Sequence, residues 1–170
     1  ASSLYRFSND LYEVVFIEPE AAVKEVIFKN YQSSKFILYN GLSIAPDGLI
    51  FSRESTAGNE VRFVCNTKDK KITKTFRFSN FNYTIELEIK IQNLSQAPLE
   101  LNPILVLGTL SFSGEQNEVR FQDVTVANKD KVSHLNARKD NLFAEVQFLG
   151  LRNRYFCAIL EPVSPVYSGW

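Results

Sequence analysis

Apolar residues recur at every second position along much of this chain. In the clearest run, residues 83–92, apolar and polar side chains alternate: Tyr83, Ile85, Leu87, Ile89 and Ile91 against Thr84, Glu86, Glu88, Lys90 and Gln92. Because successive side chains of a β-strand point to opposite faces, this run predicts an antiparallel strand with one face in the core and one in water. Shorter alternations at 12–16 and 61–63 predict further strands of the same kind.

Residues that favour tight turns separate these runs. They occur at 40–41, 46–48, 58–59, 93–98 and 113–114. Short strands joined by such turns are typical of sandwiches and barrels. Since no stretch has a sustained helical period, we expect helix only as a short turn, near 149–154. The pattern therefore predicts an all-β fold.

Composition limits the size and the partners of this fold. A chain of 170 residues, 45% of them hydrophobic, can bury one sizeable core, so we expect a single domain over residues 1–170. Lys plus Arg and Asp plus Glu both number 19, which gives no basic field for nucleic acid. The longest apolar runs, such as 104–107 and 157–160, are far shorter than the roughly 20 residues that cross a bilayer. The short runs predict a soluble piece. The chain also has no Met and begins with Ala1, so we expect it to be processed or cut from a larger protein.

No constellation of catalytic or metal-binding residues stands out. His134 is the only histidine and lies in a polar stretch, 127–141, that reads as a solvated loop around one short strand. Cys65 and Cys157 lack the close spacing of metal ligands, and we expect them to be buried unpaired thiols, with a disulfide as the alternative. Glu86 and Glu88 share the wet face of their strand as solubilising charges. We therefore expect no catalytic, cofactor-binding or metal-binding residue, and no residue stands out for binding.

Several segments carry a more specific pattern when they are taken in order. They are FSNDLYEVVF (7–16), AAVKEVIFKNY (21–31), TFRF (75–78), NYTIELEI (82–89), IQNLSQAPL (91–99) and LGLRNRYFCAILEP (149–162). This series resembles the first periplasmic domain of the YidC family of membrane-protein insertases (YidC/Oxa1/Alb3). The chain departs from the family where 18–21 replaces the usual glycine turn, and where it stops at Trp170, which implies a shortened or partial domain.

The resemblance implies both a fold and a role. The fold would be a twisted antiparallel β-supersandwich of the galactose mutarotase-like type, on the periplasmic side of the bacterial inner membrane. The domain would be a docking or scaffolding module without enzymatic activity or cofactors. Its partners would be accessory subunits of the Sec translocon, of the SecD/SecF type, and nascent membrane proteins. The transmembrane core of the family is absent from this sequence.

Three other interpretations stay open. A mutarotase-like enzyme shares the fold but needs a histidine with a carboxylate, and only His134 is available. A carbohydrate-binding protein could stack sugars on tyrosines, which are Tyr5, Tyr12, Tyr31, Tyr39, Tyr83, Tyr155 and Tyr167. An adhesion domain is the third possibility, and it rests on the strands and on two Asn-x-Ser/Thr sequons, 82–84 and 93–95.

Overall fold

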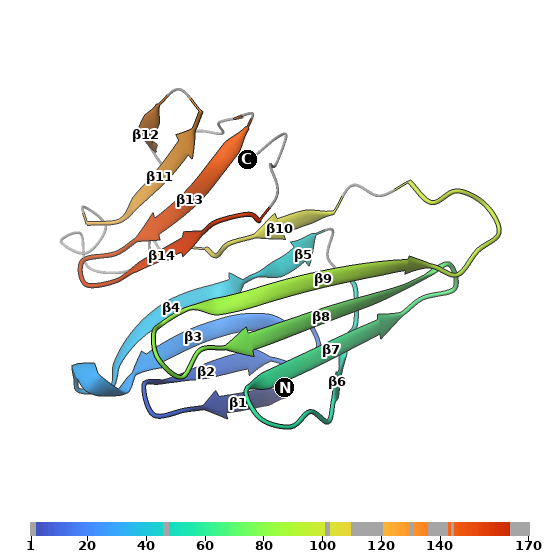
Figure 1. The fold of residues 1–170 in the computed structure, drawn as a ribbon, viewed down its shortest axis with the longest axis horizontal. Helices are drawn as coiled ribbons and strands as arrows, with labels where there is room; N and C mark the ends of the chain where they lie inside the picture. The colour runs from blue at the N-terminus through green and yellow to red at the C-terminus, as the bar shows by residue number, and fades with distance from the viewer. Residues whose placement is uncertain are drawn as a thin grey trace. The chain divides into compact units, whose positions relative to one another are not determined.

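The computed structural model of this chain describes residues 3–45, 48–100, 103–109, 121–129, 131–135, 143 and 145–163. These residues form β-strands joined by loops, and the only helix among them is a 3-10 turn, η1 (Lys29–Tyr31) (Figure 1). The predicted all-β fold is therefore confirmed. The helical turn predicted near 149–154 is wrong, because strand β13 (Val146–Arg152) covers most of that segment and pairs with a neighbouring strand on each side.

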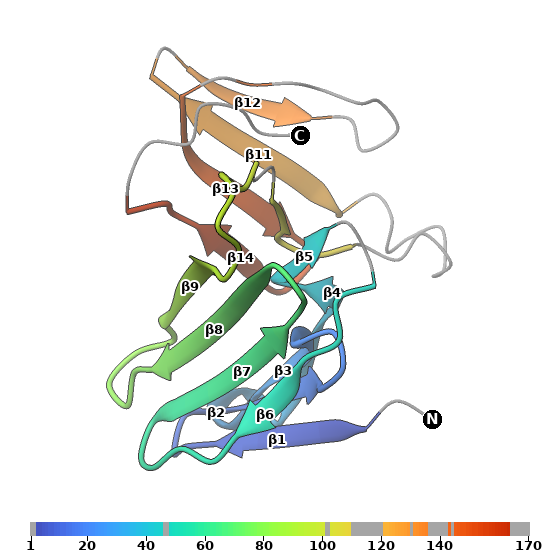
Figure 2. The ribbon, with the colours of Figure 1, turned by 90° about the vertical axis from the view of Figure 1, so that its right-hand side faces the viewer.

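The chain forms two compact units, residues 1–109 and 110–170. Unit 1 contains two antiparallel four-stranded sheets and a two-stranded ladder (Figure 1, Figure 2). The first sheet has the order β1 (Leu4–Ser8), β2 (Tyr12–Ile17), β3 (Ala22–Phe28) and β4 (Ser34–Gly41). The second has the order β6 (Ser52–Glu54), β7 (Glu60–Asn66), β8 (Lys70–Phe78) and β9 (Ile85–Asn93). The ladder pairs β5 (Ser43–Ala45) with β10 (Ile104–Val106). That residues 1–170 act as a single domain stays a prediction.

The two four-stranded sheets of unit 1 pack face to face around aromatic side chains. Phe16 on β2 is fully buried, and its ring centroid lies 5.4 Å from that of Phe63 on β7 and 4.9 Å from that of Phe76 on β8. Phe7 on β1 stacks on Phe78 of β8, with ring centroids 3.8 Å apart. Rings from both sheets therefore interdigitate, and unit 1 is a β-sandwich.

The alternation in residues 83–92 predicts the faces of β9 correctly but overestimates its burial. Leu87 pairs with the buried Phe76 of β8, and Ile85 pairs with Phe78, so the apolar side chains do share the core face. Each of them is only half-buried, however. The reason is that β9 is the last strand of its sheet, so its side chains have a neighbouring strand on one side only.

Strand β4 carries a bulge just before it leaves the first sheet. Between Ile37 and Gly41, the pairing advances four positions on β4 and two on β3. The left-handed residues are Tyr39, with φ 55, and Leu42, with φ 58, rather than the glycine of the predicted turn at 40–41. Gly41 serves close packing instead, because a Cβ there would lie 2.8 Å from Cβ of Leu38 and 2.9 Å from a β3 carbonyl oxygen.

Other predicted turns are present where the structure describes them. Gly58 has φ 72, as the turn at 58–59 requires. In the turn at 93–98, Asn93 Oδ1 accepts the backbone N–H of Ser95 at 2.9 Å, and its amide nitrogen donates to the carbonyl of Ala97 at 2.8 Å. The turn predicted at 113–114 and positions 46–47 of the turn at 46–48 lie outside the described residues.

The described part of unit 2 is a single antiparallel sheet with the order β12-β11-β13-β14. Its other strands are β11 (Asp123–Asn128), β12 (Val132–Leu135) and β14 (Cys157–Leu160). Strand β12 is the short strand predicted within 127–141, while positions 130 and 136–141 lie outside the described residues.

Replacing Phe76 by alanine should lower the free energy of unfolding by about 3–5 kcal/mol, because the ring is fully buried between the sheets of unit 1. Leu87→Ala should cost less, below about 2 kcal/mol, because the side chain is half-exposed on the edge strand. Urea titrations of both variants give the two values. Equal costs would contradict the described burial of β9.

Candidate functional site

The outer face of the second sheet of unit 1 carries a dense set of charged side chains. They come from four neighbouring strands: Glu54 on β6, Glu60 and Arg62 on β7, Lys71 and Arg77 on β8, and Glu86, Glu88 and Lys90 on β9. Antiparallel register aligns them, since Arg77 pairs with both Glu60 and Glu86, and Thr73 pairs with Lys90. We call this surface, together with Thr73 and Thr75, the polar face.

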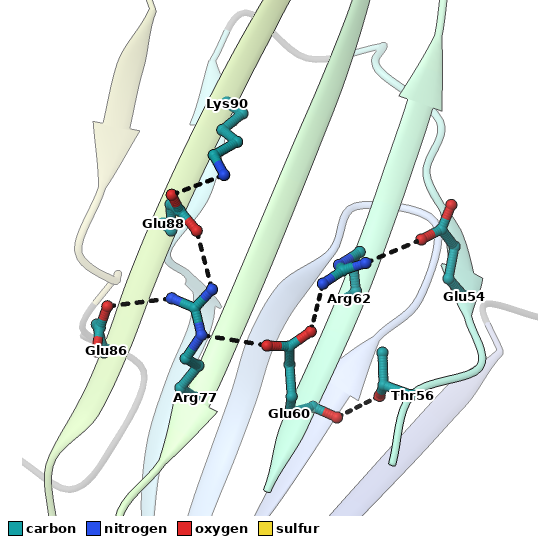
Figure 3. A network of polar contacts seen from close by, with 8 residues as sticks. All are labelled: Glu54, Thr56, Glu60, Arg62, Arg77, Glu86, Glu88 and Lys90. Atoms are coloured by element: carbon teal, nitrogen blue, oxygen red, sulfur yellow. Dashed lines mark hydrogen bonds and ion pairs between the residues drawn. The ribbon is translucent and has the colours of Figure 1, made fainter. Parts of the chain in front are cut away.

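Arg77 is the centre of the ion-pair network on the polar face (Figure 3). Its guanidinium lies 3.1 Å from a carboxylate oxygen of Glu60, 3.1 Å from one of Glu86 and 3.0 Å from one of Glu88. The hydrogen bond to Glu88 raises the pKa of Arg77. Hydrogen bonds from Lys90 and then from Arg77 lower the pKa of Glu88. The array is fixed in geometry but open to water, so each pair stabilises the fold only slightly.

The network continues to the other edge of the sheet. Arg62 lies 2.6 Å from a carboxylate oxygen of Glu60 and 3.8 Å from one of Glu54 (Figure 3). Thr56 donates its hydroxyl to the backbone carbonyl of Glu60. Cations and carboxylates therefore alternate across all four strands, which fixes a pattern that a partner surface of complementary charge could match.

A shallow hollow of ≈ 220 Å³ lies on the polar face. Thr73 and Thr75 are short side chains flanked by longer ones, including Arg62, Lys71 and Lys90, so the surface dips between them. The glutamates that sequence reasoning set aside as solubilising charges, Glu86 and Glu88, both lie on this outer face as predicted. What the sequence did not reveal is that they share one arginine.

The only histidine lies on a strand and pairs with a carboxylate. His134 on β12 has Nδ1 2.8 Å from Oδ2 of Asp123 on β11, and Thr125 Oγ1 lies 3.0 Å from the same oxygen. Burial raises the pKa of Asp123, but the hydrogen bonds from His134 and Thr125 outweigh it and lower the pKa below its usual value. His134 therefore lies on the short strand predicted within 127–141, and its side chain is exposed.

The two cysteines differ in burial. Both thiols are free; Cys65 is buried as expected, but Cys157 is exposed, because β14 lies at the edge of its sheet.

Within the part of the chain that the structure describes, no three His, Cys, Asp or Glu residues gather as metal ligands. No helix in the described ranges is long and apolar enough to span a bilayer.

A protein-family model of the YidC periplasmic domain matches residues 44–165. This chain belongs to that family. No curated protein matches the sequence. The match contains the segments 75–89, 91–99 and 149–162 on which the resemblance was based, and it starts after the segments 7–16 and 21–31. As a YidC periplasmic domain, the chain lies on the periplasmic side of the inner membrane and is associated with a membrane-protein insertase.

The turn at which this chain departs from the YidC glycine pattern is closed by Ala21. Ala21 is fully buried and has φ 46, a left-handed conformation that alanine adopts at a cost. Its N–H donates to the carbonyl of Glu18 at 3.0 Å. Its own carbonyl accepts a hydrogen bond from the ammonium group of Lys74, which reaches across the core from β8. A buried lysine thus holds the turn that a glycine would otherwise form.

Lys74 is the one lysine among the described residues that is fully buried. Its ammonium also donates to the carbonyl of Leu42, the left-handed residue after β4. The rings of Phe51 and Phe76 lie beside it, with centroids 5.7 Å and 5.3 Å from Nζ. Burial lowers the pKa of Lys74 to about 7.

The stability of this domain should depend on pH through Lys74. In the unfolded chain a lysine has a pKa of about 10.4, so between pH 7 and 10 the unfolded state holds more protons than the folded state. The free energy of unfolding should therefore rise with pH over this window. In the Lys74→Met variant, the free energy of unfolding measured at pH 10 should no longer exceed that at pH 7 by this amount.

Lys71→Met is the matched control, because it removes a lysine from the outer side of the same strand and should keep the wild-type rise. A Lys74→Met variant with the same pH dependence as the wild type would show that Lys74 is charged in the folded protein throughout.

Proposed function

We propose that this YidC periplasmic domain is a docking or scaffolding module that performs no bond chemistry of its own. Its partners are accessory subunits of the Sec translocon, of the SecD/SecF type, or nascent membrane proteins. The observation that carries the proposal is the polar face, where Arg77 is held by three carboxylates and further ion pairs extend across the sheet.

A preordered array of charges suits recognition better than it suits stability. Arg77 already has its geometry fixed by Glu60, Glu86 and Glu88, so little side-chain freedom is lost when a partner binds. Complementary charges then select the partner and speed association more than they add affinity.

The polar face also has two distinct ends. Lys71 and Lys90 lie toward one end, beside Thr73, while Glu60 and Glu86 flank Arg77 at the other. The hollow over the threonines gives a partner side chain a place to enter. A surface whose two ends differ in charge, and which contains a hollow, can fix the orientation of a bound protein.

Weak binding is sufficient for such a module. A domain tethered to the same membrane as its partner experiences a high effective concentration of that partner. A small contact of low intrinsic affinity can then hold the assembly together. Assays with separated components would underestimate this interaction, so the test belongs in the full-length insertase.

Deleting the domain from the full-length insertase should reduce co-purification of the Sec accessory subunits while insertion of simple substrates persists. Both quantities are measured in the same membranes. If insertion collapses and Sec association is unchanged, the domain belongs to the insertion mechanism and the docking proposal is wrong.

The double substitution of Lys71 and Lys90 by serine should cause the same loss of co-purification without deletion, because it removes the cationic end of the polar face. Replacing Lys129 and Lys131 by serine is the matched control, since these two exposed lysines flank the β11–β12 turn of unit 2. Equal loss in both double variants would point to a general charge effect rather than to the polar face.

A further inference from the structure

Three connections meet at one end of unit 1: the β1–β2 turn, η1 and the β8–β9 loop (Figure 1). Aromatic side chains gather there. The ring of Tyr83 lies with its centroid 5.4 Å from that of Phe28 and 6.3 Å from that of Tyr31. Phe28 and Tyr31 are themselves 6.3 Å apart. We call these three residues and Phe81 the aromatic end.

Much of the aromatic end faces solvent. Phe81 is 95% exposed, Tyr31 57% and Tyr83 43%. Full burial of such a ring would stabilise the protein by about 1.5–3 kcal/mol, and Phe81 gains almost none of this in the fold. Exposed aromatic side chains gathered at one end of a unit are typical of a contact surface.

The loop that carries Phe81 is held in place by hydrogen bonds. Ser79 Oγ accepts the backbone N–H groups of Phe81 and Asn82 at 3.2 Å, and Asn82 Oδ1 accepts that of Thr84 at 3.0 Å. The carbonyl of Ser79 accepts the hydroxyl of Tyr12 at 3.2 Å, which ties the loop to the first sheet. Phe81 is therefore presented on an ordered loop, and its exposure is a fixed feature of the surface.

The aromatic end is close to electrically neutral. Charged residues make up 22% of the whole chain, yet the β8–β9 loop, 79–84, has none. Segments 9–11 and 29–33 contribute only Asp10 and Lys29, which have opposite signs. The nearest charges along β8 and β9, Arg77 and Glu86, pair with each other at 3.1 Å. The remaining polar groups of these segments are mostly amides and hydroxyls.

We propose that the aromatic end is a membrane contact, with Phe81 entering the lipid interface and Tyr31 and Tyr83 lying at the level of the headgroups. Tyrosine at the interface with a more apolar ring deeper is the arrangement by which proteins rest on bilayers. The periplasmic location of the domain keeps a lipid surface within reach, and the neutral charge suits a largely zwitterionic one. This proposal concerns a different surface from the polar face and does not rest on the docking function.

The lipid contact should be weak and local. One ring and two partly exposed tyrosines bury little area, so in the insertase the tether to the membrane strengthens the contact, and with the untethered chain the contact needs a high vesicle concentration to be detected. It would orient the domain relative to the bilayer rather than anchor it. An experiment therefore has to detect the depth of one side chain, not only the fraction of protein bound.

The test introduces an indole into the aromatic end by Phe81→Trp in the 170-residue chain. Trp170→Phe removes the native tryptophan fluorescence. Vesicles of phosphatidylethanolamine and phosphatidylglycerol are then added, with and without brominated acyl chains. We expect the emission to shift to the blue and the brominated lipid to quench it. Ile50→Trp in the same background is the control, because Ile50 is 75% exposed and lies in a different loop, and its emission should not be quenched.

A second variant tests binding without a new indole. Phe81→Ser should leave the thermal midpoint unchanged, since the ring packs against little in the fold, and should reduce co-flotation with vesicles several-fold. The Lys71 and Lys90 double serine variant should float like the wild type, which separates this proposal from the docking function.

The proposal is overturned if brominated lipid quenches neither indole or quenches both equally. It is also overturned if soluble oligosaccharide, or an apolar peptide without lipid, shifts the emission of the indole in the Phe81→Trp variant while vesicles do not. The first of these two results would make the aromatic end a sugar platform, and the second a protein-binding site.

Discussion

The ammonium group of Lys74, on the second sheet of unit 1, forms hydrogen bonds with two turns that adjoin strands of the first sheet. It donates to carbonyls of Ala21 and Leu42, which both have left-handed backbones that are unfavourable for residues other than glycine. A buried amine must be hydrogen-bonded, so its position on β8 and the shape of both turns depend on one another. A substitution of any one of these three residues therefore also changes the hydrogen bonding of the other two.

Strand β8 contributes to the core of unit 1 with one face and to the polar face with the other. Its inner side carries Lys74 between Ile72 and Phe76, all of them buried in the core. Its outer side carries Lys71, Thr73, Thr75 and Arg77. The two threonines lie at the bottom of the hollow on the polar face, and Arg77 is the centre of the ion-pair network. Because one strand supplies both, the rigid packing on one side gives the exposed charges on the other a stable support.

The alternation of apolar residues was sufficient to predict β2, β7 and β9 and the two faces of β9, because side-chain period depends only on local geometry. The same rule also places Lys74 on the core side, two positions from Ile72 and from Phe76, although a lysine is easily assigned to the solvent. Contacts between distant segments could not be predicted in this way. The neighbours Tyr31 and Tyr83 are 52 positions apart, and the pairing of His134 with Asp123 depends on a hairpin register that the residues alone do not specify.

The ladder between β5 and β10 has a consequence for the order of folding. Its pairs, such as Ala45 with Ile104, join segments on either side of the entire second sheet, so they close a loop that contains β6 to β9. Closing so long a loop is entropically costly until the intervening strands are compact. The hairpins of the second sheet should therefore form first, with the ladder closing afterwards, and the ladder can open again without taking the aromatic core apart.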